Sequence, residues 1–241
     1  MAGSYYIALS GMRARLDALD RVASDIANVD TAGYKAERAA TVQADRPQFG
    51  EALQAAIDVA DGPTRVDLRG GAIAPTGREL DLAIDGPGLF AVNTPGGERY
   101  TRDGRFVRRT DGVLTTAAGD SIESVDGGPI TLPTGPVQID EDGSVRVGGN
   151  VVGRLKVVEF AAPGALVKDN ARLFHADAQA PKAATASPVR TGSLEQSNVS
   201  VVERLTELTT VTRSFEALQR ALSTMVNDID GRAISELGRR S

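Results

Sequence analysis

Apolar residues recur at helical spacing near both ends of the chain. In the N-terminal stretch they follow steps of three and four, the a/d pattern of a coiled-coil helix, and are Leu9, Met12, Leu16, Leu19, Ala23 and Ile26. The C-terminal stretch has the same steps and comprises Leu208, Val211, Phe215, Leu218, Leu222, Met225 and Ile229. We therefore predict one amphipathic helix at each end and call these two sets the seams.

Local signals place one boundary of each helix. Asn28, Asp30 and Thr31 have side chains that compete for backbone hydrogen bonds, and Gly33 can adopt a left-handed conformation. The first helix is therefore expected to stop at this stretch. The second is expected to begin at the segment Ser200–Glu203, which fits a capping box.

The sequence pattern in the middle of the chain predicts β structure. All eleven Pro lie between Pro47 and Pro188, where Gly is also concentrated. Short apolar runs alternate with turn signals, among them Asp103-Gly104, Asp111-Gly112 and Asp142-Gly143, which can supply the positive φ of tight hairpins. We predict an antiparallel all-β body at roughly 70–174, followed by an extended linker.

These elements define an α+β protein in which the N- and C-terminal helices pair as an antiparallel coiled-coil domain with an inserted antiparallel all-β domain. The expected division is 1–35 and 196–241 for the helical domain, 36–70 for a connecting segment, 71–175 for the β-rich domain and 176–195 for a return linker. Two paired helices cannot cover apolar stripes this wide. The remaining apolar surface is expected to contact other chains.

Composition narrows the classes of partner. The net charge of −5 and the pI near 5.1 argue against a nucleic-acid-binding surface. No run approaches the ~18 apolar residues of a membrane span, and the N-terminus lacks the pattern of a cleavable signal peptide. The chain has no Cys, which excludes disulfides and thiolate chemistry.

Candidate chemistry is sparse. The only histidine, His175, is expected to be a solvated bystander. Asp81 and Asp85 flank Leu-Ala-Ile and could form an acid/base pair, but we expect Asp81 on the exposed face of a strand and Asp85 at a turn. The stretch Asp140–Val145 has part of a calcium-loop pattern but fits a hairpin turn better. We expect neither an enzyme nor a bound cofactor or metal.

Four segments, in order, resemble the bacterial flagellar basal-body rod and hook proteins. They are "ALSGMRARLDALDRVASDIANVDTAGYKAER" (8–38), "GAIAPTGRELDLAIDGPGLFAV" (71–92), "YTRDGRFVRRTDGVLTTAAGDSI" (100–122) and "GSLEQSNVSVVERLTEL" (192–208). The family commonly has Gly-Phe-Phe where this chain has Gly88-Leu89-Phe90. Distal rod and hook members usually carry Gln-Arg-Ala-Tyr-Glu where this chain has Thr212–Glu216. The second difference favours a proximal-rod member.

The resemblance implies a structural role. The terminal helices would form the inner tube of an axial structure, and Asn28, Thr31, Gly33 and Tyr34 would form the elbow where the chain leaves it. Expected partners are copies of this chain and other flagellar rod proteins, the flagellar type III export apparatus, and the surrounding basal-body rings as a further candidate. The expected place is the periplasmic rod, reached without a cleavable signal peptide and without membrane insertion.

The sequence alone leaves three other functions open. The chain could be a distal rod or hook-type subunit of the same family. It could instead be a β binding module for carbohydrate or peptidoglycan tethered by a coiled coil, although the absence of Trp disfavours sugar stacking. A hydrolase would have to use Asp81 and Asp85.

Overall fold

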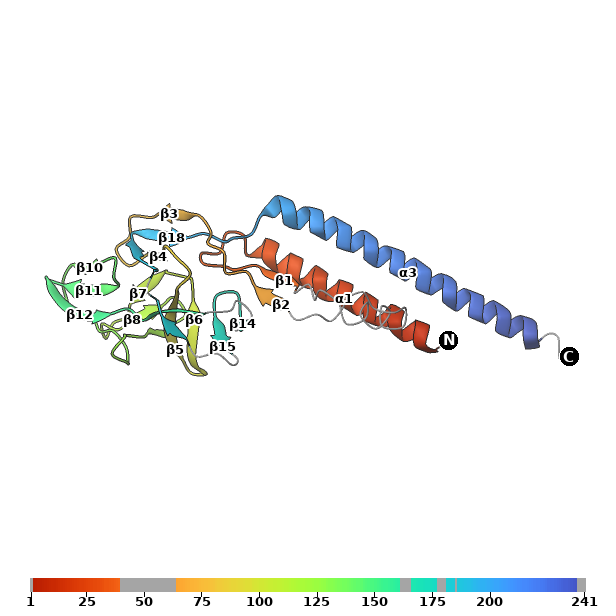
Figure 1. Cartoon of the computed structure of the whole chain (residues 1–241), viewed down its shortest axis with the longest axis horizontal. Coiled ribbons are helices and arrows are strands. Elements are labelled where there is room, and N and C mark those ends of the chain that lie inside the picture. Colours follow the sequence, from red (N-terminus) through yellow and green to blue (C-terminus); the bar gives the residue numbers. More distant parts are fainter. Residues whose placement is uncertain (1, 40–63, 161–165, 177–180, 185, 238–241) are drawn as a thin grey trace. The chain divides into compact units, whose positions relative to one another are not determined.

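The computed structural model describes residues 2–39, 64–160, 166–176, 181–184 and 186–237. The chain divides into two compact units. One comprises Met1–Ile26, Ala39–Thr64 and Val201–Ser241 and is called the helical unit here; the other comprises Ala27–Arg38 and Arg65–Ser200 and is called the β unit. The fold is α+β, with two helices and many antiparallel strands in the described parts of the chain (Figure 1).

The helical unit contains α1 (Ala2–Ala27, 26 residues) and α3 (Val201–Leu237, 37 residues). Both boundaries predicted from the sequence are confirmed, because α1 ends directly before Asn28 and α3 begins directly after Ser200. Neither helix, over its described residues, combines the length and apolar character needed to cross a membrane.

Among their described residues, α1 and α3 meet at an ion pair and at a close approach of a leucine to the α1 backbone, and the two helices lie side by side in Figure 1. Asp25 Oδ2 lies 3.1 Å from Arg204 Nε. A methyl group on Gly11 would lie 3.9 Å from Leu218 Cδ1, so this seam position of α3 faces the backbone of α1. Pairing as a coiled coil along the whole of both seams remains a prediction.

Short strands make up the β unit and its connections. The first nine are β1 (Glu37–Ala39), β2 (Thr64–Val66), β3 (Ile73–Pro75), β4 (Leu82–Ile84), β5 (Leu89–Thr94), β6 (Gly97–Thr101), β7 (Phe106–Arg108), β8 (Leu114–Thr116) and β9 (Ser121–Ile122). The next nine are β10 (Val137–Ile139), β11 (Ser144–Val147), β12 (Asn150–Arg154), β13 (Val157–Glu159), β14 (Leu166–Lys168), β15 (Phe174–Ala176), β16 (Lys182–Ala183), β17 (Val189–Thr191) and β18 (Ser193–Glu195).

The largest sheet has nine strands and is centred on β5. Its main path runs β14-β15-β6-β5-β9-β8-β7, and β13 pairs with both β5 and β16. A three-stranded sheet has the order β10-β11-β12, and the remaining pairs are β1-β2, β17-β4 and β18-β3. The pairs β17-β4 and β18-β3 each join a strand from the beginning of the β unit to one from its end.

The core lies on both faces of β5. Phe90 and Val92 pack into one apolar cluster, and Leu89 and Ala91 pack into another. This follows from the strand geometry, because successive side chains point to opposite faces. Phe90 also meets Phe106 edge to face, with ring centroids 5.1 Å apart.

Of the three Asp-Gly pairs predicted to form hairpin turns, two are confirmed and one is wrong. Gly112 (φ 86°) closes the hairpin between β7 and β8, and Gly143 (φ 83°) closes that between β10 and β11. Asp103-Gly104 does not form a hairpin, because β6 and β7 are not neighbours in the sheet. A Cβ on Gly104 would lie 1.6 Å from the carbonyl oxygen of Leu82, so glycine is required there by a close backbone approach.

The segment suggested as a return linker, 176–195, contains β16, β17 and β18 in its described part. These strands pair with β13, β4 and β3 respectively. Within the suggested connecting segment 36–70, residues 40–63 lie outside the described residues.

Candidate assembly site

The N-terminal seam is largely uncovered in the single chain. Leu9 is 41% exposed and Leu16 is 46% exposed. Of the other four seam positions on α1, Ala23 is exposed and Met12, Leu19 and Ile26 are half-buried. The buried side chains on the described part of α1 are instead those of Val22 and Asp25.

The C-terminal seam shows the same partial cover. Val211 is buried, and the half-buried positions are Leu208, Phe215, Leu218 and Leu222. Further apolar side chains are exposed at the start of α3, where Val202 is 75% exposed and Leu205 is 48% exposed. The side chains of Met225 and Ile229 lie outside the described residues. Both helices therefore present apolar surface that the described part of this chain does not cover.

The predicted elbow residues lie in consecutive turns directly after α1. Thr31 donates backbone and side-chain hydrogen bonds to the backbone and side-chain oxygens of Asn28, both at 3.1 Å. The backbone N–H of Tyr34 then donates to the carbonyl of Thr31 at 3.2 Å. Gly33 has φ +67°, and a Cβ there would lie 2.2 Å from the carbonyl carbon of Arg102. Glycine at this position therefore meets both a torsional and a steric requirement.

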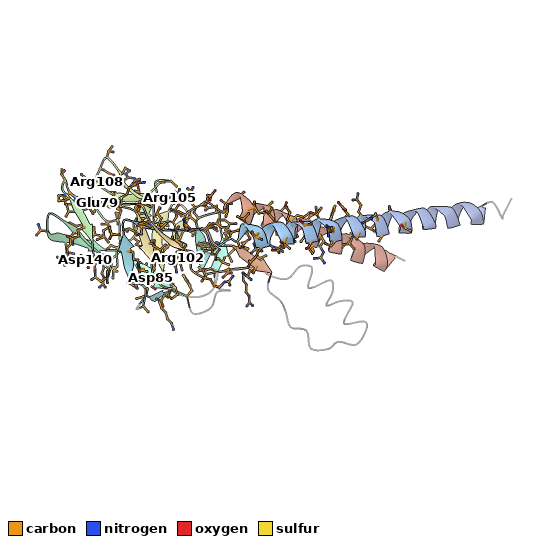
Figure 2. The ribbon with its side chains drawn as sticks, turned by 90° about the horizontal axis from the view of Figure 1, so that it is seen from above. Glu79, Asp85, Arg102, Arg105, Arg108 and Asp140 are labelled. Atoms are coloured by element: carbon orange, nitrogen blue, oxygen red, sulfur yellow. The ribbon has the colours of Figure 1, made fainter. Side chains whose placement is uncertain are left out.

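A buried group of three charges follows the elbow. Lys35 Nζ lies 2.6 Å from Glu195 Oε1, and Arg102 Nη1 lies 2.9 Å from Glu195 Oε2. All three side chains are at most 1% exposed. Arg102, labelled among the strands in Figure 2, also donates to the carbonyls of Ile84 and Gly86.

Burial and charge act in opposite directions on the two cations of this group. Burial lowers the pKa of Lys35, and the neighbouring Glu195 carboxylate raises it in partial compensation. Burial likewise lowers the pKa of Arg102, again opposed by Glu195. The Glu195 carboxylate thus partly offsets the effect of burial on the pKa of both cations.

Backbone hydrogen bonds join the same parts of the chain. The N–H of Gly33 donates to the carbonyl of Glu195 at 2.8 Å, and the N–H of Asn198 donates to the carbonyl of Tyr34 at 3.3 Å. The N–H of Ala36 donates to Asn198 Oδ1 at 2.8 Å. We define the clasp as the incoming segment Gly33–Ala36, the outgoing segment Glu195–Asn198 and the Arg102 side chain.

Two further groups hold the clasp. The Asn198 side-chain amide donates to the carbonyls of Asp67 and Arg69 at 2.7 Å and 3.1 Å. The Lys168 ammonium lies 3.8 Å from the centroid of the Tyr34 ring and donates to the carbonyl of Lys35 at 2.9 Å. The clasp therefore joins segments that are far apart in sequence but belong to one unit.

Gly33 and Tyr34 were predicted as site residues from the sequence, whereas their charged partners Lys35, Arg102 and Glu195 were not. A signal was available, because each of the three lies within a segment that carries the family resemblance: "GYK", "YTR" and "LEQSN". Periodicity could not reveal them, since a buried charge interrupts the apolar pattern that marks a core position.

The two aspartates considered for catalysis are not brought together. The expectation that Asp81 is exposed is wrong: its side chain is 2% exposed, lies 3.6 Å from Arg78, and its backbone bridges to Arg105. Asp85 lies at the other end of β4, half exposed and paired with Arg190. Each carboxylate has its own arginine, an arrangement typical of structural ion pairs.

His175 is not the solvated bystander that was expected. It lies in β15, is 30% exposed, and its Nδ1 contacts the Asp169 carboxylate, which also pairs with Arg99. Arg99 and His175 outweigh burial and hold the pKa of Asp169 below its usual value, although burial acts to raise it. Within the described residues, no group of three or more His, Asp or Glu side chains is arranged to hold a metal ion.

Three family models match the chain in sequence order. The model for flagella basal body rod proteins matches residues 6–35, which span most of α1 and the elbow. The model for the flagellar hook protein FlgE/F/G D1 domain matches 83–147 in the β unit. The model for the flagellar basal body rod FlgEFG protein C-terminal region matches 190–235, which includes the outgoing segment and most of α3.

Curated relatives match over nearly the whole chain. The flagellar basal-body rod protein FlgF of Caulobacter vibrioides is 34% identical over 99% of both chains. FlgF of Mesorhizobium japonicum is 31% identical over 100% of both chains. The flagellar basal-body rod protein FlgG of Bacillus subtilis is 30% identical over 93% of this chain and 95% of that protein. The chain belongs to the flagellar basal-body rod protein family.

Proposed function

We propose that this chain is a structural subunit of the flagellar basal-body rod, of the proximal type, and that it helps to transmit torque from the motor to the hook. The FlgF relatives that align with at least 99% of the chain support the proximal type. They also favour the rod over a coiled-coil-tethered binding module, because they carry the name of a rod protein.

The observation that carries this proposal is the uncovered apolar surface on α1 and α3. Leu9 and Leu16 on α1, and Val202 and Leu205 on α3, are each more than 40% exposed. Burying a leucine side chain contributes roughly 1.5–3 kcal/mol. A surface repeated on every copy favours contacts between neighbours, and contacts that do not close on themselves build a helical filament.

In this proposal the terminal helices pair as an antiparallel coiled coil in the inner tube of the rod. The seams then pack against copies of this chain and against other rod proteins, and the elbow leads the chain into the β unit. The subunit reaches the periplasm through the flagellar type III export apparatus. The basal-body rings are further candidate neighbours of the β unit.

The test places two carboxylates on the C-terminal seam by combining Phe215→Asp with Leu222→Asp. Both side chains are half-buried in the single chain, and burial of an unpartnered carboxylate between subunits costs several kcal/mol at each copy. We expect rod assembly to stop at this subunit, so that electron microscopy finds basal bodies without distal rod, hook or filament although the protein is exported.

A matched control combines Ala217→Asp with Thr224→Asp. These positions have the same seven-residue spacing, are exposed, and lie on the face of α3 opposite the seam. This variant should assemble complete rods. Complete rods in the Phe215→Asp, Leu222→Asp variant would show that the seam is not an assembly surface.

A further inference from the structure

The two segments of the clasp run in the same direction. Gly33 bonds to Glu195, whereas Tyr34 and Ala36 bond to Asn198, so the residue numbers of the partners rise together. The incoming segment begins at its Gly33 end, and the outgoing segment finishes at its Asn198 end. The chain therefore enters and leaves the clasp at opposite ends of the paired stretch.

The parallel direction of the two segments determines how the clasp resists a pulling force. A force that separates residues 27 and 200 slides the two segments along each other and loads all of their bonds at once. Were the segments antiparallel, the same force would act at one end of the stretch and break the bonds one after another. Breaking several bonds together is the slower process, because their free energies add in a single barrier.

The composition of the clasp adds to this resistance. Its bonds include two from cations to one carboxylate, and hydrogen bonds of this kind are about twice as strong as neutral ones. Lys35 and Glu195 are 0% and 1% exposed, so water has little access to replace their contact during sliding. The Arg102 guanidinium also anchors the outgoing segment to the carbonyls of Ile84, the last residue of β4, and of Gly86.

We propose that the clasp is a mechanical clamp that carries tension between the two ends of the β unit and shields the sheets behind it. Residues 37–194 lie between the two bonded segments along the chain, so while the clasp is closed its bonds carry most of the tension past the sheets. Arg102, Asp67 and Arg69 take up a share only through their bonds to the outgoing segment. The link between this clamp and torque rests on the proposed rod function, whereas the clamp itself rests on the bonding pattern.

Single-molecule pulling on the full-length protein tests the proposal. The chain has no cysteine, so handles attach only at introduced positions. Ala27→Cys with Ser200→Cys loads the clasp by sliding. Arg38→Cys with Ser200→Cys applies force at the finishing ends of both segments and peels the same bonds apart. All three positions are exposed.

We expect the β unit to survive at least about tenfold longer at a given force when pulled from 27 and 200 than from 38 and 200. Introducing Lys35→Met into the 27 and 200 protein should shorten that lifetime by about tenfold or more, the effect expected for loss of a charged hydrogen bond. Asn198→Ala should act in the same direction and serves if Lys35→Met does not fold.

The matched control is Asp85→Asn, which removes an exposed ion pair within the β unit but outside the clasp. Its lifetime should stay within about twofold of the parent, because exposed pairs contribute little. Equal lifetimes for the two pulling directions, or no effect of the clasp substitutions, would overturn the proposal. These measurements need no assembled rod, so failure of the proposed rod function would leave their outcome unchanged.

Discussion

Glu195 shows how the family motifs work at the scale of single residues. Its Oε1 accepts hydrogen bonds from Lys35 Nζ and from the backbone N–H of Gly71 at 2.8 Å, and its Oε2 accepts from Arg102. A buried carboxylate with both oxygens paired is tolerated, but removing one partner of such a group costs about 3–5 kcal/mol. Lys35, Arg102 and Glu195 lie in three separate sequence motifs, but each therefore depends on the others for its partners in the buried site.

Gly33 gives a prediction that separates torsional strain from steric conflict. Gly33→Ala should lower the free energy of unfolding of the β unit by about 3 kcal/mol or more, because it adds a clash with the Arg102 backbone to the strain of φ +67°. The control is Gly77→Ala, at φ +73° with no atom within 4 Å of the added Cβ. It should cost only about 1 kcal/mol. Urea unfolding measures both, and equal costs would contradict the close approach at Gly33.

Tyr100 gives a prediction about alkaline pH. Burial, assisted by the charge of Glu98 and a hydrogen bond with it, raises the pKa of Tyr100 from 10.0 to about 12. Since the folded-state value lies above the unfolded one, this group's stabilisation is complete below about pH 10 and is lost as the pH rises through 12.

An absorbance titration of the phenols follows this directly. The chain has four tyrosines and no Trp, so the signal is simple to interpret. Tyr100→Phe should remove a phenol that ionises near pH 12 from the folded protein. If the variant instead loses a phenol that ionises near pH 10, the environment of Tyr100 does not favour its neutral form.

At the scale of elements, local patterns predicted what local physics decides. The seams correctly predicted both helices, and Asn28 and Ser200 predicted where α1 ends and α3 begins. Asp-Gly pairs predicted the hairpins at Gly112 and Gly143. The error at Asp103-Gly104 arose because the same dipeptide also suits a close approach to a distant strand. A local pattern contains no information on which strand that is.

The pairing of distant elements was out of reach for the same reason. β3 pairs with β18 across more than a hundred residues, and the Lys35–Glu195 contact spans 160 positions. Hydrophobic alternation specifies which face of a strand is buried but not its partner. The candidate site was therefore foreseen at the elbow glycine, and its charged partners were missed.

The contact between Asp25 and Arg204 tests how the two helices are held together. The Asp25 side chain is 2% exposed and that of Arg204 is 11% exposed. Asp25→Ala should destabilise the pairing of α1 with α3 by about 3 kcal/mol, because it leaves the guanidinium without this partner. Faster amide exchange in α1, measured by mass spectrometry, is the expected sign.

Glu207→Ala is the matched control for that prediction. Glu207 also pairs with Arg204, but it is exposed and lies three residues away on the same helix. Exposed pairs of this kind contribute at most about 0.5 kcal/mol, so exchange in α1 should be nearly unchanged. Similar effects of Asp25→Ala and Glu207→Ala would show that burial of the Asp25 contact adds nothing.

At the scale of the whole molecule, the two units differ in how much core each contains. The β unit has two apolar clusters that share β5. In the helical unit, the buried apolar side chains among those described are Val22 and Val211. Helices in water gain most of their stability from packing of an apolar face. The helical unit should therefore depend on neighbours that the β unit does not need.

This difference predicts that the free monomer unfolds in two steps. Tyr5 and Tyr6 lie in the helical unit, so Tyr5→Phe with Tyr6→Phe leaves a tyrosine signal that comes from the β unit alone. In this protein, helical circular dichroism should be lost at lower urea than the tyrosine signal, and amides of α1 and α3 should exchange faster than those of β5. Non-coincident transitions are the standard sign that two parts do not unfold as one. Phe215→Asp with Leu222→Asp should shift only the first transition, because both side chains belong to the helical unit. Coincident transitions in a verified monomer, or an equal shift of both in the variant, would mean that the units share their stability and that the seams are already satisfied within one chain.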